Sequence, residues 1–70
     1  MYIVFENVMS NVTLYFALTE NQMKDEKSKV LFENGTCTEI ARVKTVREMR
    51  ALNTATQISY INNKGQIKFA

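Results

Sequence analysis

The stretch Val30-Leu31-Phe32-Glu33-Asn34-Gly35-Thr36-Cys37, VLFENGTC, is compatible with two different folds. Asn34-Gly35 suits a two-residue type I′ hairpin turn, because both residues tolerate the positive φ angles of that turn. The same pair suits the end of a helix, where a glycine often adopts the left-handed conformation. The choice decides whether the first half of the chain is all sheet or contains a helix.

A helix over Glu20 to Glu33 would have good signals at its ends. Thr19 is a candidate N-cap, and Gln22 three residues later completes a capping box. The apolar face of this helix is poor, because residues 24–29 are all charged apart from one serine. We therefore expect the hairpin, with residues 30–32 as a strand and residues 21–27 before it as a charged loop or a single helical turn.

The hairpin also gives a usable core face. With a two-residue turn, Phe32 lies opposite Cys37, and side chains alternate along both strands. Five apolar residues then share one face: Val30, Phe32, Cys37, Ala41 and Val43. This register makes Cys37 a core residue and not a nucleophile.

Two further strands are expected before this hairpin. Residues 2–5 form a short run of β-type residues, and residues 12–18 alternate between apolar and mostly smaller or polar side chains. Residues 7–11 contain asparagine and serine and supply a turn. The pattern predicts an antiparallel pair at the start of the chain.

After the hairpin, Thr45-Val46-Arg47-Glu48 is a second capping-box pattern. It predicts a short helix from about Val46 to Leu52 that ends at a left-handed Asn53. An alternative is a longer helix over residues 38–52, whose apolar stripe would include Ile40 and Met49.

The last segment, TQISYINNKGQIKFA, predicts another hairpin. A four-residue loop from Asn62 to Gly65 pairs Tyr60 with Ile67 and Ile58 with Phe69. All four apolar side chains then lie on one face, whereas a slip of one residue divides them between both faces.

The expected order is β-β-β-β-α-β-β, an α+β fold with a small, mostly antiparallel sheet or open barrel and one short helix. The alternative is a β-β-α-β-type fold with the longer helix at residues 38–52. Residues 1–70 form a single domain in either case, because no proline, repeat or linker divides them. A domain of this size buries only about 60% of its unfolded surface, so a homodimer would add useful core.

The composition excludes several classes of chemistry. The chain has no histidine and one cysteine, so it cannot build a histidine-activated nucleophile or a Cys/His zinc site alone. Its two glycines are both assigned to turns, which leaves none for a phosphate-binding loop. We expect a non-enzymatic protein with no catalytic residues, no metal and no cofactor.

Charge is distributed unevenly along the chain. Residues 37–70 carry six basic and two acidic side chains, whereas residues 1–36 carry three basic and five acidic ones. A basic face is the candidate binding site, with a tyrosine as a stacking surface. Its residues are Arg42, Lys44, Arg47, Arg50, Lys64, Lys68 and Tyr60.

The apolar start of the chain is interrupted by Glu6, Asn7 and Ser10 and has no preceding basic residue, unlike a signal peptide or membrane span. We therefore expect a cytoplasmic protein without a membrane partner. In its length, its lack of catalytic residues and its asparagine and methionine content, the chain resembles small accessory proteins that phages and mobile elements use against host machinery.

The resemblance implies a protein that binds and inhibits a host protein or nucleoprotein complex in the host cytoplasm. A nucleic-acid-binding module that uses the basic face is one alternative. A structural homo-oligomer or virion component is another, because the sequence lacks prolines to block its sheet edges.

Overall fold

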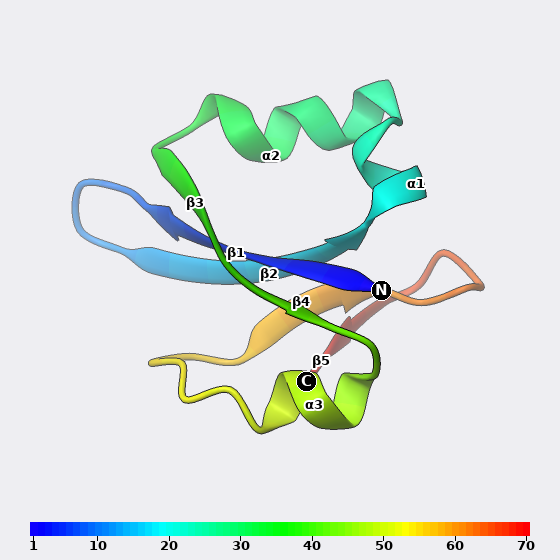
Figure 1. The fold of residues 1–70 in the computed structure, drawn as a ribbon. Coiled ribbons are helices and arrows are strands. Elements are labelled where there is room, and N and C mark those ends of the chain that lie inside the picture. The colour runs from blue at the N-terminus through cyan, green and yellow to red at the C-terminus, as the bar shows by residue number, and fades with distance from the viewer.

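Five strands form one mixed sheet in the computed structural model, which describes all residues from 1 to 70 (Figure 1). The sheet has the order β3-β1-β2-β4-β5, so β3 and β5 are its edges. Only β2 and β4 pair in parallel. The strands are β1 (Tyr2–Val8), β2 (Thr13–Thr19), β3 (Thr36–Val43), β4 (Ile58–Ile61) and β5 (Ile67–Phe69). The expected α+β class with a small, mostly antiparallel sheet is confirmed.

Short helices cover parts of both faces of the sheet (Figure 1). The connection from β2 to β3 contains α1 (Glu20–Met23), the 3₁₀ turn η1 (Glu26–Lys29) and α2 (Val30–Glu33). The connection from β3 to β4 contains α3 (Val46–Arg50), which lies on the opposite side. We call the two sides the α2 face and the α3 face.

The prediction of a hairpin at Asn34-Gly35 is wrong, because residues 30–33 are helical and β3 pairs with β1. A type I′ turn needs positive φ angles at both central residues. Gly35 has a φ of 75°, but Asn34 has a φ of −108° and is extended. The pair therefore ends a helix and starts a strand.

The helical connection forms despite its poor apolar face because it is made of short, locally stabilised pieces. Thr19 caps α1, and the reciprocal hydrogen bonds of the capping box with Gln22 are both present. Phe32 at the far end packs edge-on against Phe5 and Phe16, with ring centroids 5.1 and 5.6 Å apart. One aromatic anchor thus replaces the continuous apolar stripe of a longer helix.

The sheet carries a separate hydrophobic cluster on each face. The α3-face cluster contains the fully buried Met49 of α3 among its members Val4, Ala17, Val43, Met49 and Ile58. The α2-face cluster contains Ile3, Phe5, Phe16 and Leu18. Residues 3–5 of β1 and 16–18 of β2 are buried and alternate between the two faces, so each of them contributes to one cluster or the other.

A β-bulge in β3 divides residues 37–43 between the two faces of the sheet, whereas Cys37, Ala41 and Val43 were expected to share one face. Val4 pairs with Ala41 and Phe5 pairs with Glu39, so Ile40 is an extra residue between them. Cys37 packs against the α2-face cluster, as expected, but it pairs with Asn7 of β1 and not with Phe32. Ala41 belongs to the α3 face instead, and so does Val43 at the end of β3, because the bulge reverses the alternation.

The short helix after β3 begins as expected, since Thr45 accepts a hydrogen bond from the Glu48 N–H at 3.1 Å. It ends at Arg50, two residues early, and Asn53 is not left-handed. The alternative helix over residues 38–52 is wrong, because most of its first half pairs with β1 in the sheet.

The C-terminal hairpin forms, but its expected register is wrong by one residue. Tyr60 pairs with Lys68 and Ile61 pairs with Ile67. The Asn62 N–H donates to the Gln66 carbonyl at 3.0 Å, so the loop between this pair has three residues, 63–65, and ends at Gly65, whose φ is 77°. A three-residue loop that ends in a left-handed residue is a common hairpin connection. The slip divides the apolar residues between the two faces. Ile58 and Tyr60 pack in the α3-face cluster, whereas Ile67 and Phe69 lie on the α2 face and stay exposed.

Candidate functional site

The structure does not bring the seven residues of the expected basic face together. Arg42 lies on β3 and Lys68 lies on β5, at opposite edges of the sheet. Arg42 also forms an ion pair with Glu39, with a nitrogen–oxygen distance of 3.0 Å. The hydrogen bond from Arg42 holds the pKa of the Glu39 carboxyl below its usual value and raises that of Arg42.

The remaining members lie in two other places. Lys44, Arg47 and Arg50 are exposed at and just before α3. Lys64 lies in the loop between β4 and β5. Tyr60 is half-buried and packs edge-on against Tyr2 with ring centroids 5.9 Å apart, so its ring already has an aromatic partner.

The residues that could do chemistry are dispersed. No three histidine, cysteine, aspartate or glutamate side chains lie close enough to hold a metal ion together. Burial raises the pKa of the Cys37 thiol, which donates to the Leu31 carbonyl oxygen at 3.5 Å. No helix in the chain has the length and apolar character needed to cross a membrane.

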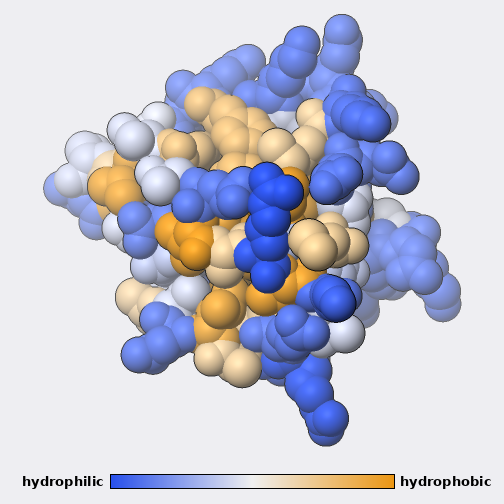
Figure 2. Space-filling view, in the orientation of Figure 1, coloured by the Kyte–Doolittle hydropathy of each residue, from blue (hydrophilic) through white to orange (hydrophobic).

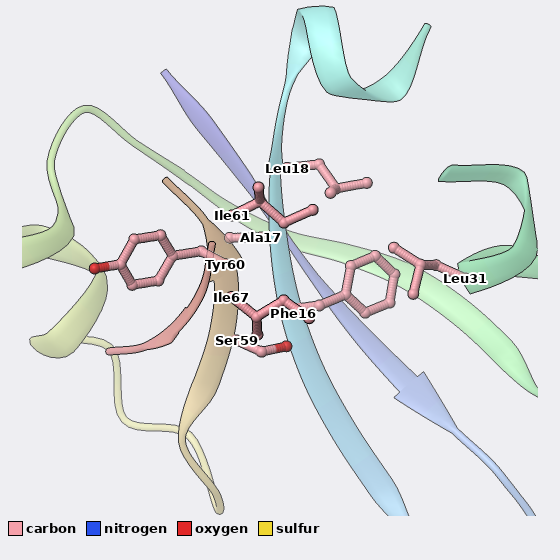
Figure 3. A pocket seen from close by; sticks show the side chains of 8 residues that line it. All are labelled: Phe16, Ala17, Leu18, Leu31, Ser59, Tyr60, Ile61 and Ile67. Carbon is pink, nitrogen blue, oxygen red and sulfur yellow. The ribbon is translucent and has the colours of Figure 1, made fainter. Parts of the chain in front are cut away.

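An apolar groove lies on the α2 face between α2 and the β4–β5 hairpin (Figure 3). Five apolar side chains from β2, α2, β4 and β5 surround it, whereas the Tyr60 side chain points away. These five are Phe16, Leu18, Leu31, Ile61 and Ile67. The groove forms because the helical connection covers β1 and β2 through Phe32 but leaves the outer part of the hairpin open.

Two large apolar side chains beside the groove are in contact with solvent. Ile67 is 69% exposed and Phe69 is 61% exposed. Both project from the α2 face of β5, since residues two apart on a strand share a face. The observed register causes this exposure: Ile58 and Tyr60 pack on the α3 face, while Ile67 and Phe69 lie on the part of the α2 face that the helices leave uncovered.

The groove encloses about 90 Å³. Sites for small-molecule ligands and cofactors usually have volumes of about 300–1,000 Å³. The groove is thus too small for a cofactor, but apolar side chains from a partner could cover it and its exposed neighbours.

Other exposed apolar residues do not form a comparable groove. In the view of Figure 2, hydrophobic residues reach the surface in the middle of the molecule, but hydrophilic side chains lie across them. Ile40 on β3 is 42% exposed. Single exposed apolar side chains of this kind are normal on protein surfaces.

Sequence reasoning placed Ile67 and Phe69 in the core and therefore missed this site. The signal that could have found it is the position of Gly65, because a three-residue loop ending in a left-handed glycine sets the observed register. Leu31 was missed because residues 30–32 were expected to form a strand, whereas they belong to α2. No protein-family model matches the chain, and no match was found among the curated proteins or the solved structures.

Proposed function

We propose that this protein acts by binding another protein through the apolar groove and the adjoining β5 strand. The observation that carries the proposal is the exposure of Ile67 and Phe69 next to a groove that is itself apolar. Burying a side chain of this size contributes about 1.5–3 kcal/mol. Burial of both side chains by a partner would therefore contribute a substantial part of the binding free energy of a specific complex.

Inhibition of a host protein or nucleoprotein complex is the role that we propose for this binding. A protein that occupies the working surface of its partner needs no catalytic group. The resemblance of the sequence to phage and mobile-element accessory proteins supports this role, with the cytoplasm of a host cell as its compartment.

The test is affinity capture from a bacterial lysate with the tagged chain, followed by mass spectrometry. We expect a stoichiometric protein that the wild type retains and the Phe69→Ser variant loses. Val12→Ser is the matched control, because Val12 is 50% exposed near the turn between β1 and β2, outside the groove. Capture of no stoichiometric protein, or equal capture by all three chains, would contradict the proposal.

Nucleic-acid binding is a second candidate, supported by the three unpaired basic residues Lys44, Arg47 and Arg50 near α3. About three phosphate contacts to duplex DNA predict a slope near −2.7 for log affinity against log salt concentration. Filter binding at several salt concentrations measures this slope. Absence of binding at low salt, or unchanged binding of the Arg47→Ala/Arg50→Ala double variant, would exclude this candidate.

A further inference from the structure

We propose, on the basis of the protein-binding function above, that β5 accepts an extended segment of the partner as a sixth strand. The segment carries an acidic residue between two large apolar residues. Three features of β5 support this mode of binding: its free backbone groups, its exposed side chains and its charge.

The outer edge of β5 has unpaired backbone groups. β5 pairs with β4 alone. The Asn62 N–H donates to the Gln66 carbonyl at 3.0 Å, and the Ala70 N–H donates to the Ile58 carbonyl at 2.8 Å. Hydrogen-bonded pairs alternate with non-bonded pairs along an antiparallel ladder. The pair midway between these two is Tyr60–Lys68, so the backbone N–H and C=O groups of Lys68 point to β4.

The same alternation turns the N–H and C=O groups of Ile67 and Phe69 away from β4. These are the two residues whose side chains are exposed on the α2 face. A strand added to this edge would satisfy their backbone groups and cover their side chains together. Main-chain pairing of this kind supplies affinity, and alternate side chains supply specificity.

The other edge of the sheet is less suitable for an added strand. β3 contains the bulge at Ile40, which interrupts a regular ladder. It also presents the Glu39–Arg42 ion pair at the surface. Bulges and charged side chains are the usual features that protect an edge strand from pairing.

The charge of the β5 edge selects an acidic partner. Residues 51–70 contain Lys64 and Lys68 and no acidic residue. Lys68 has no ion-pair partner in the chain. An added strand places one residue beside Lys68 and its two neighbours beside Ile67 and Phe69, so an acid flanked by apolar residues complements β5. Two copies of β5 paired about their centres would place Lys68 beside Lys68, which is unfavourable.

The first measurement is binding of a fluorescein-labelled peptide, Ser-Leu-Glu-Leu-Glu-Leu-Ser, followed by fluorescence anisotropy. A peptide with lysine in place of both glutamates is the control. We expect the acidic peptide to bind more tightly than the basic peptide. Equal binding of the two peptides would overturn the assignment of an acidic partner.

Variants locate the binding on the chain. We expect Ile67→Thr to weaken binding of the acidic peptide about tenfold, whereas Ile40→Thr on the opposite edge leaves it unchanged. We expect Lys68→Glu to reverse the preference in favour of the basic peptide, whereas Lys44→Glu preserves it. Identical effects at both edges would contradict binding at β5.

Two outcomes separate this inference from the proposed function. If partner capture depends on Phe69 but the chain binds neither peptide, strand addition is wrong and the apolar surface alone binds the partner. If light scattering finds a dimer that Ile67→Thr dissociates, the occupant of the edge is a second copy, and the proposed acidic partner is excluded.

Discussion

At the scale of single residues, the two glycines have the same conformation but different surroundings. Gly35 and Gly65 have φ angles of 75° and 77°. A Cβ atom on Gly35 would lie 2.5 Å from Asn7 Oδ1 and 2.6 Å from the Val8 carbonyl oxygen, whereas one on Gly65 would meet nothing within 4 Å. Gly35 thus permits close contact between the start of β3 and the end of β1.

We expect Gly35→Ala to destabilise the chain by about 3 kcal/mol, since left-handed strain and overpacking add. Gly65→Ala should cost only about 1 kcal/mol, because it introduces strain alone. Urea unfolding followed by circular dichroism measures both values. Equal losses for the two variants would contradict the packing at Gly35.

Cys37 provides a second prediction at this scale. Because its thiol pKa is higher in the folded chain, its contribution to stability is present below the unfolded pKa and is lost as pH rises through the folded value. We expect iodoacetamide to alkylate the folded chain more slowly than the urea-unfolded chain at mildly alkaline pH. The midpoint of the rate–pH curve should also be higher for the folded chain. A lower midpoint would indicate an activated thiol.

At the scale of elements, Gln22 joins the helical connection to the sheet. Its side-chain oxygen accepts from the Thr19 N–H at 2.9 Å, and its amide nitrogen donates to the Ile61 carbonyl at 3.2 Å. Glu48 occupies the equivalent position of α3 but accepts only from the nearby Lys44 N–H, at 3.4 Å.

We expect Gln22→Ala to lower the free energy of unfolding by about 2 kcal/mol, because it removes a cap and a link to β4. The matched variant Glu48→Ala should cost less than about 1 kcal/mol. Thermal unfolding of both variants tests this difference. A larger loss for Glu48→Ala would show that Gln22 does not couple α1 to the sheet.

Features determined by neighbouring residues could be predicted from the sequence at this scale. The cap at Thr45, the antiparallel pair β1–β2 and the left-handed Gly65 are of this kind. The capping box of Thr19 and Gln22 was also visible in the sequence, but the hairpin was preferred to the helix that it predicts. The partner of β3 and the bulge at Ile40 could not be predicted, because each depends on contacts between distant parts of the chain. The face of Ile67 was missed because a four-residue loop was expected in place of the three-residue loop that ends at Gly65. The exposure at the candidate site could not be predicted, because it depends on how far the helices extend over the α2 face.

At the scale of the whole molecule, the helices do not cover the two faces equally. α3 closes its face through Met49, whereas the helical connection stops short of β4 and β5 on the other. The uncovered part of the α2 face lies at the β5 edge of the sheet, where the side chains of Ile67 and Phe69 are exposed. This edge has no bulge and no ion pair, unlike the β3 edge. The proposed binding site therefore follows from the topology of the sheet and not from the total charge.

Amide hydrogen exchange, measured residue by residue by NMR, tests the central proposal of binding at the β5 edge most directly. In the free chain, we expect the Ile67 and Phe69 amides to exchange quickly and the Lys68 amide slowly, because among these three amides only that of Lys68 points to β4. Saturation with the acidic peptide should protect Ile67 and Phe69 and leave the β3 amides unchanged. Protection of the β3 amides, or no protection of the Ile67 and Phe69 amides in the complex, would contradict binding at the β5 edge.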